Sequence, residues 1–406
     1  MQLRFDLNQF LLAASTLIDF VEMDVLGVAS NHGKRVAYLS ARLGERAGLS
    51  REEIFDLVAL AVLHDNGLSE EVLFTDFDGI GRDRIQLIEG LRAHCELGER
   101  NVAGFPFLTE PADVIRLHHE RHDGKGFFGL RGDQTPLMAR IIGMADFVDF
   151  LFGFGSPDPA TRDRIRAYIA DNRDTAVCPA VADLFLEVSA RPAFWLDLRD
   201  EFIGDALGRV TPAFARDIPL AALFEVGRVF SRIVDCKSKF TQRHSGGLEE
   251  KAARMAEAYG FDDDRAMLLR ISAAFHDLGK MAIPNAIIDK PGRLDAGEVL
   301  KMQEHSYYTR RCLEKVPGFA TITEWASNHH ERLDGSGYPL GLTAAHLDFE
   351  ARLLACLDIY QALTEERPYR RPMTHGDAME VLRTQAAEGK LDAAVVADLD
   401  RVFAGG

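Results

Sequence analysis

The chain has 406 residues, enough for two or three domains, and its 47% hydrophobic and 27% charged residues are typical of a soluble globular protein. Its formal net charge of −16 argues against a nucleic-acid-binding protein, although bound cations would still let an acidic chain take a small anionic substrate. No apolar run approaches the length of a membrane span, and the first residues lack the plan of a signal peptide, so we expect a cytoplasmic protein without a membrane partner.

Helical periodicity dominates both halves of the chain. One predicted helix runs sixteen residues from His32 to Gly48, and another runs sixteen residues from His244 to Gly260. Each ends at the glycine, and an apolar residue and an acidic helix start follow it. Strand-like alternation is scarce, so we predict an all-α protein with many helices. The apolar residues at helical spacing are Val36, Leu39, Leu43 and Ala47 in the first helix and Leu248, Ala252, Met255, Ala256 and Tyr259 in the second.

Histidines recur in two sets with nearly the same spacing, and each set ends at an aspartate. Successive members are 32, 30, 24 and 28 residues apart in the first half, and 32, 29, 24 and 29 apart in the second. Ten of the thirteen histidines belong to these sets, and this order indicates a duplicated metal centre. The first set is His32, His64, Asp65, His94, His118, His119 and Asp146. The second set is His244, His276, Asp277, His305, His329, His330 and Asp358.

The duplication extends beyond the histidines and defines two domains. Residues 118–124 match residues 329–335, and an Ala-Arg pair precedes the last aspartate of each set. The boundary falls within 195–220, and we divide the chain into 1–205 and 206–406. Without a Gly/Ser-rich or Pro-rich tract there, we expect a rigid helical connection.

The residue types of the two sets favour divalent ions. Imidazole and carboxylate without thiolate suit iron, manganese, nickel or zinc, and the five scattered cysteines, which contain no Cys-x-x-Cys, predict reduced thiols and no sulfur-based zinc site. Five histidines with two aspartates exceed what one ion needs, so we expect two ions about 3.5–4 Å apart. Such a pair could activate water and neutralise a phosphodiester.

Cationic residues in the second half suit a phosphate substrate. Lys280 follows Asp277 by three residues, where its ammonium could hold a phosphate oxygen. The segments 290–293 and 367–371 add cations near apolar and aromatic residues, which could contact phosphates and stacked bases. The alternatives are a solvated lysine at a helix end and charged or Gly/Pro-rich surface turns.

Several motifs of the second half occur in one order. They are Lys237-Ser238-x-Phe240-Thr241-x-x-His244-Ser245, His276-Asp277-x-Gly279-Lys280, His305, His329-His330-Glu331, Asp334-Gly335-x-Gly337-Tyr338-Pro339 and Asp358-x-x-x-Ala362-Leu363-Thr364-x-x-Arg367-Pro368-Tyr369. From about residue 237 to its end the chain thereby resembles the HD-GYP family of phosphodiesterases. The resemblance implies an all-helical domain with two or three divalent ions, often iron or manganese, with nickel, zinc or magnesium as further options. It also implies hydrolysis of a cyclic dinucleotide, usually cyclic di-GMP, to a linear dinucleotide or to mononucleotides.

The resemblance also implies residue roles. One ion would be bound by His244, His276, Asp277 and Asp358, and the other by Asp277, His305, His329 and His330. Asp277 would bridge both and Lys280 would steady the scissile phosphate, making these two the catalytic residues. Members with a third ion carry a glutamate where Phe240 stands, so two ions are expected here. The expected substrate contacts are Lys280, Arg293, Asp334, Gly335, Gly337, Tyr338, Pro339, Arg367 and Arg370.

The first half keeps all these ligand positions, and a further metal there is compatible with them, but it loses other features. Leu68 stands in the place of Lys280, and residues 124–128 replace the Gly-Tyr-Pro loop. We therefore predict a divergent HD-like domain with a regulatory role or altered activity. Three histidines outside the sets are expected at the surface and three phenylalanines in an interdomain core. These residues are His122, His346 and His375, and Phe147, Phe150 and Phe152.

Three other functions remain open. One is a phosphodiesterase specific for the mixed cyclic GMP–AMP dinucleotide, which the sequence does not distinguish from one acting on cyclic di-GMP. Another is a non-catalytic signalling module that uses its metals structurally and binds a cyclic dinucleotide or a partner protein through the loop around Tyr338. An HD nucleotidase acting on mononucleotides fits less well, because it would lack the Gly-Tyr-Pro motif. Family analogy also makes a homodimer reasonable.

Overall fold

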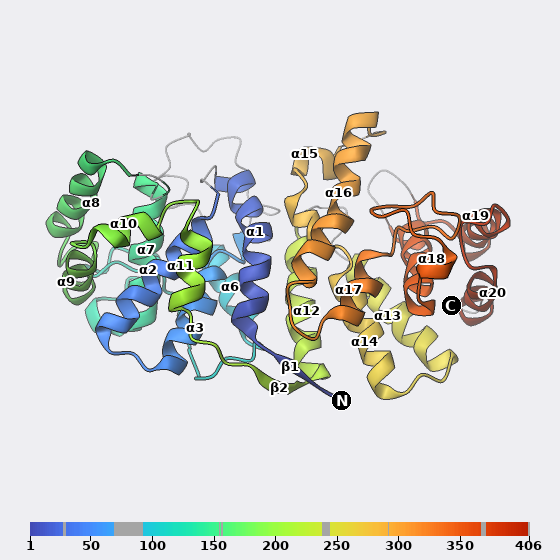
Figure 1. The fold of residues 1–406 in the computed structure, drawn as a ribbon, viewed down its shortest axis with the longest axis horizontal. Coiled ribbons are helices and arrows are strands. Elements are labelled where there is room, and N and C mark those ends of the chain that lie inside the picture. Colours follow the sequence, from blue (N-terminus) through green and yellow to red (C-terminus); the bar gives the residue numbers. More distant parts are fainter. Residues whose placement is uncertain are drawn as a thin grey trace. The chain divides into compact units, whose positions relative to one another are not determined.

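The computed structural model describes residues 1–26, 30–68, 92–153, 155, 157–237, 244–290, 292–366 and 371–404. In this part of the chain nearly all regular structure is helical, which confirms the all-α prediction. A small antiparallel sheet pairs β1 (Gln2–Phe5) with β2 (Arg216–Pro219). The chain forms two compact units, an N-terminal one from Asp6–Ala215 and a C-terminal one from Met1–Phe5 with Arg216–Gly406 (Figure 1).

The division between the units lies ten residues after the predicted 205/206 boundary. The predicted boundary falls inside α11 (Ile203–Val210), a helix that packs against α2 (His32–Ala47) of the N-terminal unit. The first five residues belong to the C-terminal unit because β1 pairs with β2. Neither feature leaves a composition signal in the sequence.

The N-terminal unit is built around α2. This amphipathic helix packs against α3, α7, α9 and α11, and most of its residues are buried. Within its described residues the helices of this unit are α1 (Leu7–Leu26), α2, α3 (Arg51–Val62), α6 (Ala93–Val102), α7 (Leu137–Phe152), α8 (Pro159–Asp171), α9 (Pro179–Val188), α10 (Pro192–Asp197) and α11.

The C-terminal unit repeats the central part of this arrangement and extends it. Its α13, α14, α16 and α18 correspond in sequence register to α2, α3, α6 and α7. The helices are α12 (Leu220–Asp235), α13 (His244–Ala258), α14 (Asp263–Phe275), α15 (Asn285–Ile288), α16 (Ala296–Leu313), α17 (Ala320–Ser327), α18 (Phe349–Thr364), α19 (His375–Ala387) and α20 (Ala393–Phe403).

The predicted helix–glycine–helix punctuation is confirmed in both units. Gly48 caps α2 with a left-handed φ of 79°, and Ser50 then begins α3 with a capping box to Glu53. In the second unit Gly260 has a φ of 64°, and the Asp262 side chain caps α14. These caps fix where α3 and α14 begin, and so where their His-Asp pairs lie at the other end.

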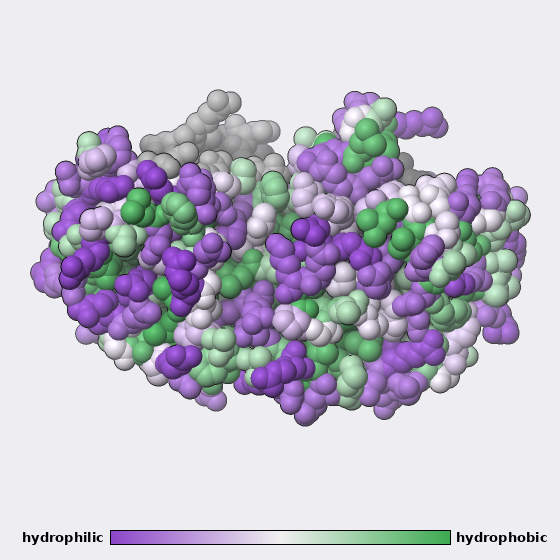
Figure 2. Space-filling model, in the orientation of Figure 1, coloured by the Kyte–Doolittle hydropathy of each residue, from purple (hydrophilic) through white to green (hydrophobic). Residues whose placement is uncertain are grey.

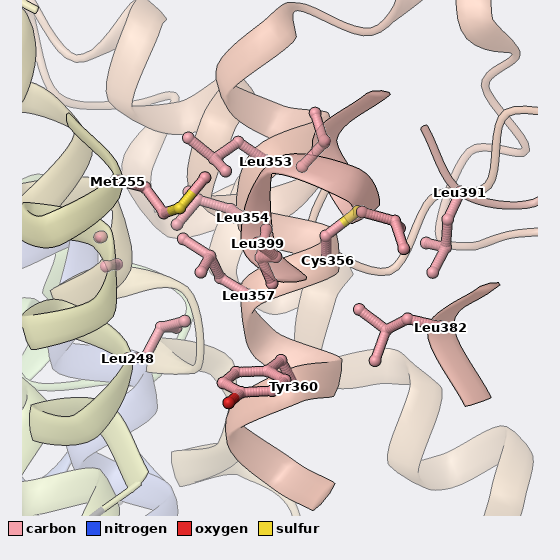
Figure 3. Packing of buried hydrophobic residues seen from close by; sticks show 14 of the residues in the cluster. Leu248, Met255, Leu353, Leu354, Cys356, Leu357, Tyr360, Leu382, Leu391 and Leu399 are labelled. Atoms are coloured by element: carbon pink, nitrogen blue, oxygen red, sulfur yellow. The ribbon is translucent and has the colours of Figure 1, made fainter. Parts of the chain in front are cut away.

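A hydrophobic cluster of the C-terminal unit holds two of the helices that carry predicted ligands. Leu248 and Met255 from α13 face Leu354 and Leu357 from α18, while α19 and α20 close the cluster (Figure 3). Burying a leucine side chain stabilises a fold by roughly 2 kcal/mol, so this cluster strongly fixes α13 against α18. It thereby sets the separation of His244 and Asp358.

The outer surface agrees with the charged composition. Hydrophilic residues dominate the face drawn in Figure 2, with small hydrophobic patches between them. Among the described residues, no helix has the length and apolar character needed to cross a bilayer.

Candidate metal centre

The structure brings all seven residues of the second set into one buried cluster. His244 is the first residue of α13, and the His276–Asp277 pair directly follows α14. His305 lies on α16, the His329–His330 pair follows α17, and Asp358 lies on α18. Five separate segments, spread over more than one hundred residues of sequence, therefore contribute to a single site.

Asp277 lies between two groups of nitrogen donors. Its Oδ2 is 3.0 Å from His276 Nε2, and its Oδ1 is 3.4 Å from His305 Nε2 and 3.9 Å from His329 Nε2. On one side, His305, His329 and His330 present ligand atoms within 4.8 Å of one another. Each carboxylate oxygen therefore faces a different group, which is the arrangement a bridging carboxylate needs.

The other group forms around Asp358. Its Oδ1 is 3.1 Å from His244 Nε2 and 3.9 Å from His276 Nε2, and its Oδ2 is 3.8 Å from His330 Nδ1. His244, His276 and Asp358 together present ligand atoms within 4.8 Å of one another. The two groups match the two ligand sets that the family resemblance implies.

Backbone carbonyls orient three of these imidazoles. The Nδ1 atoms of His276, His305 and His329 lie 2.6–2.7 Å from the carbonyl oxygens of the residues three positions earlier. A carbonyl can only accept, so each Nδ1 carries the proton and each Nε2 turns its lone pair to the site. Metal-ligating histidines are commonly oriented in this way.

The orientation of these imidazoles indicates whether cations fit the site. The Nε2 atoms of His305 and His329 are 3.4 Å apart, and both are acceptors in the neutral imidazoles. Burial lowers the pKa of His305 to about 4 and that of His329 to about 3, so both rings are neutral near pH 7. Two lone pairs facing each other repel unless a cation lies between them. The residues present therefore fit a bound divalent ion.

The two carboxylates stay ionised despite their burial. Burial raises the pKa of Asp277, but His276 and Lys280 outweigh it and hold this pKa well below its usual range. Burial likewise raises the pKa of Asp358, and His244 with His330 more than offsets it. Asp277 and Asp358 thus offer anionic oxygens beside the neutral nitrogens of His305 and His329, the forms in which these groups bind divalent cations.

A carboxylate that sequence reasoning missed supports His244. Glu365 Oε2 lies 3.0 Å from His244 Nδ1 and holds the ring through the nitrogen that does not face Asp358. Burial lowers the pKa of His244, but its bonds to Asp358 and Glu365 outweigh burial and raise this pKa to about 10. The only signal in the sequence is the position of Glu365 one residue past α18, seven residues after Asp358.

Lys280 lies directly beside the predicted bridging residue. Its ammonium donates to Oδ2 of Asp277, and its side chain is partly exposed. The preceding Gly279 packs closely on α16, where an added Cβ would lie 2.0 Å from the carbonyl oxygen of His305. This contact, which a side chain would break, fixes the turn that carries both Asp277 and Lys280.

Glu331 organises the Gly-Tyr-Pro loop. Its two carboxylate oxygens accept hydrogen bonds from the backbone N–H groups of Leu340 and Leu342, at 2.7 and 2.8 Å. The ring of Tyr338 consequently lies against His330, with ring centroids 4.8 Å apart. The loop thus brings an aromatic residue to the edge of the metal cluster.

The remaining predicted substrate contacts, together with the motif residues Lys237 and Phe240, separate into three groups. Asp334 and Gly335 shape the loop, since the Asp334 carboxylate accepts from Ser336 and Gly335 has a φ of 80°. Arg293 is exposed, and Lys237 is buried and donates to the carbonyl oxygens of Met281 and Ile283. Outside the described residues lie Phe240, Arg367 and Arg370.

The first set forms a similar cluster in the N-terminal unit. Asp65 Oδ1 lies 3.4 Å from His94 Nε2 and 3.9 Å from His118 Nε2. Asp146 Oδ1 lies 3.2 Å from His32 Nε2 and 3.5 Å from His64 Nε2. On the other side of Asp146, Oδ2 is 3.8 Å from His119 Nδ1. All seven residues are again together, so the frame of the metal centre is duplicated.

A cysteine absent from the predicted set joins this second cluster. Cys95 Sγ lies 3.5 Å from His94 Nε2, although the spacing of the cysteines predicted no sulfur-containing site. Burial raises the pKa of its thiol, but His118 and His94 outweigh burial and lower it to about 7. The sequence argument did not consider this neighbour because it looked for paired cysteines, whereas the other side chains here are histidines.

The residues outside the sets have structural roles. Phe147 and Phe152, predicted in an interdomain core, pack on Tyr168 of their own unit because all three lie on the adjacent helices α7 and α8, and Phe150 is buried. His346 is exposed as predicted. His122 and His375 are only half-buried, since His122 lies 3.3 Å from Asp174 and His375 contacts Tyr360 and Asp400.

The chain is similar in sequence to known proteins. HD-domain family models match residues 30–151 and residues 228–395. The chain is 30% identical over 404 residues to the 3'3'-cGAMP-specific phosphodiesterase 1 of Vibrio cholerae serotype O1, covering 96% of this chain and 90% of that protein. A cyclic di-GMP phosphodiesterase of Thermotoga maritima is 32% identical over 171 residues, which cover 42% of this chain and 46% of that protein.

A solved structure shares the whole fold. The crystal structure of a cyclic GMP-AMP specific phosphodiesterase of Vibrio cholerae aligns with a TM-score of 0.68 at 23% identity. The alignment covers 99% of this chain and 98% of the other. The tandem arrangement of two helical units is thus common to both proteins.

Proposed function

This chain belongs to the HD-domain family, as a tandem member related to cyclic-dinucleotide phosphodiesterases, and from that premise we propose that its C-terminal unit hydrolyses a cyclic dinucleotide. The observation that carries the proposal is the position of Asp277. Its two oxygens face two separate groups of ligands, and Lys280 donates to the same carboxylate. A phosphodiester needs both neutralisation of its charge and an activated water, and this position supports both.

The residues have distinct tasks. Asp277 would hold two ions, with His244, His276 and Asp358 on one side and the other three histidines, His305, His329 and His330, completing the second side. Divalent ions bound there would activate water and neutralise the phosphodiester. Lys280 would release Asp277 in part and donate to a non-bridging phosphate oxygen, where negative charge grows during in-line attack.

The loop would position the substrate. Tyr338 presents its ring beside His330, and an aromatic face there can stack on a base of the bound nucleotide. Glu331 would keep the loop in place through its two backbone hydrogen bonds. Binding energy from the base would thereby align the scissile phosphate over Asp277.

The mixed dinucleotide 3'3'-cGAMP is the favoured substrate, ahead of cyclic di-GMP. The relative that matches almost the whole tandem chain acts on 3'3'-cGAMP by its name, whereas the cyclic di-GMP phosphodiesterase of Thermotoga matches less than half of it. The N-terminal unit, without a lysine at the place of Lys280, would not contribute hydrolysis of its own.

A competition assay tests both levels of the proposal. The purified full-length chain, loaded with Mn²⁺ or Fe²⁺ under anaerobic conditions, would receive equal amounts of 3'3'-cGAMP and cyclic di-GMP. We expect faster loss of 3'3'-cGAMP and a linear dinucleotide as the first product. Preferential loss of cyclic di-GMP would reverse the substrate assignment, and loss of neither by a fully metal-loaded chain would contradict the proposed activity.

A further inference from the structure

We propose that the N-terminal cluster is a thiolate-containing zinc site in which Cys95 is a ligand together with His94, His118 and His119. This site differs in chemistry from the C-terminal centre and does not depend on the proposed hydrolysis. The four side chains present ligand atoms that all lie within 4.8 Å of one another. Among the described residues, Cys95 is the only cysteine found in such a group.

The distances suit a shared tetrahedral ion. Zinc binds imidazole nitrogen at about 2.0–2.1 Å and thiolate sulfur at about 2.3 Å, so two ligands of one tetrahedral ion lie roughly 3.3–3.6 Å apart. The sulfur of Cys95 is 3.5 Å from His94 Nε2, and that nitrogen is 3.5 Å from His118 Nε2. These three donor atoms therefore already have the spacing that a zinc ion requires.

Local structure aims the donors at a common point. The Nδ1 of His118 lies 2.6 Å from the carbonyl oxygen of Ile115, so this ring turns its Nε2 lone pair inward. Cys95 and His94 are adjacent on α6 and almost fully buried. The buried thiol thus has three imidazoles within reach of a shared ion.

The C-terminal unit has a serine at the position equivalent to Cys95. Ser306 follows His305 as Cys95 follows His94, and its Oγ is 3.2 Å from His305 Nε2. A neutral hydroxyl is a weak ligand, whereas a thiolate selects zinc over iron, manganese or magnesium. The same backbone position thus gives an oxygen- and nitrogen-only site in one unit and a sulfur-containing site in the other.

The N-terminal donors would leave no position for a reacting water. Four protein ligands close a tetrahedral zinc shell, as in structural sites, whereas catalytic zinc keeps one position open. Asp65 also approaches His94, at 3.4 Å, but the three histidines and Cys95 complete the shell without it. Leu68, which is buried, supplies no cation for a phosphate. The site therefore has the properties of a structural or regulatory zinc site.

Cobalt substitution of the full-length chain tests this inference. Thiolate ligation gives Co²⁺ a strong charge-transfer band in the near ultraviolet, which nitrogen and oxygen ligands do not give. We expect this band in the native chain and in the control Cys236→Ser, which alters a half-buried cysteine of the other unit. Cys95→Ser should lose the band, and its zinc affinity, measured by competition with a chelator, should fall by more than about 10-fold because the thiolate ligand is gone.

Two results would overturn the inference. One is a native cobalt-loaded chain without the band, a result that needs no variant. The other is a Cys95→Ser chain that keeps both the band and the native zinc affinity. If the serine variant fails to fold, Cys95→Ala removes the sulfur without adding a polar atom to the buried position, and the same two readouts apply.

Discussion

The two units place seven candidate ligands of the same types on the same frame, yet the residues around those candidates differ. The frame is fixed by close packing. An added Cβ at Gly67 would lie 2.2 Å from the carbonyl oxygen of His94, just as one at Gly279 would lie 2.0 Å from that of His305. Side chains that face a substrate are under no such constraint. Comparing the units thus separates what holds the metal centre together from what gives it chemistry.

The support for the first histidine also differs between the units. In the N-terminal unit Asp149 binds His32 Nδ1 at 2.6 Å and also pairs with the buried Arg35. In the C-terminal unit the support is Glu365, which comes from another position of the repeat. The same need, a carboxylate behind the imidazole, is met by different residues.

Metal removal should have the largest effect. We expect chelation of the full-length chain to lower hydrolysis by more than about 10³-fold, because both the activation of water and the charge neutralisation are lost. Added Mn²⁺ or Fe²⁺ should restore it, in the native chain and in Asp65→Ala alike. Hydrolysis that persists when no metal remains on the chain would disprove the dependence.

Replacing Lys280 by leucine places in the C-terminal centre the residue type that the N-terminal unit has at the equivalent position. We expect Lys280→Leu to lower kcat by about 100-fold with unchanged metal content, since one donor to the developing phosphate charge is lost. The control is Lys390→Leu, which removes a lysine paired with Glu388 outside the predicted substrate contacts. That variant should stay within about twofold of the native rate; an equal loss in both would remove the special role of Lys280.

The two supporting carboxylates should respond differently to truncation. Glu365→Ala should weaken metal binding at the C-terminal centre by about 10-fold or more, which a metal titration measures. Asp149→Ala should in addition lower the free energy of unfolding by about 3 kcal/mol, because it leaves the buried Arg35 without this partner. Equal stability of both variants in denaturant titrations would contradict this distinction.

The smallest effect is expected from Tyr338→Phe. Phenylalanine stands at the equivalent position of the N-terminal unit, where Phe127 contacts His119 with ring centroids 5.2 Å apart. The variant keeps the ring and loses one hydroxyl, worth about 1 kcal/mol, so kcat/KM should fall no more than about fivefold. Tyr307→Phe, at an exposed tyrosine, is the matched control. A hundredfold loss at Tyr338 alone would assign its hydroxyl a direct chemical task.

The sequence predicts the all-α fold, the duplication and the seven residues of each unit that the structure brings together. It can do so because the histidine spacing is set by helix lengths that both units share. It does not predict Glu365 or Asp149 as supports, since their approach to His244 and His32 depends on how helices pack. Cys95 was missed because it has no second cysteine at a metal-binding spacing, and because the approach of His118 and His119 depends on how the segments pack. The division at residue 215 depends on the packing of α11 and the pairing of β1, which have no local signal.

The most direct measurement compares Asp277→Ala with Asp65→Ala in the full-length chain, using 3'3'-cGAMP as the substrate and measuring metal content alongside turnover. If the C-terminal unit alone hydrolyses the dinucleotide, Asp277→Ala abolishes turnover and Asp65→Ala keeps at least about half of it, a change of about twofold or less. Undiminished turnover in Asp277→Ala, or its loss in Asp65→Ala with the C-terminal centre still loaded, would contradict this assignment.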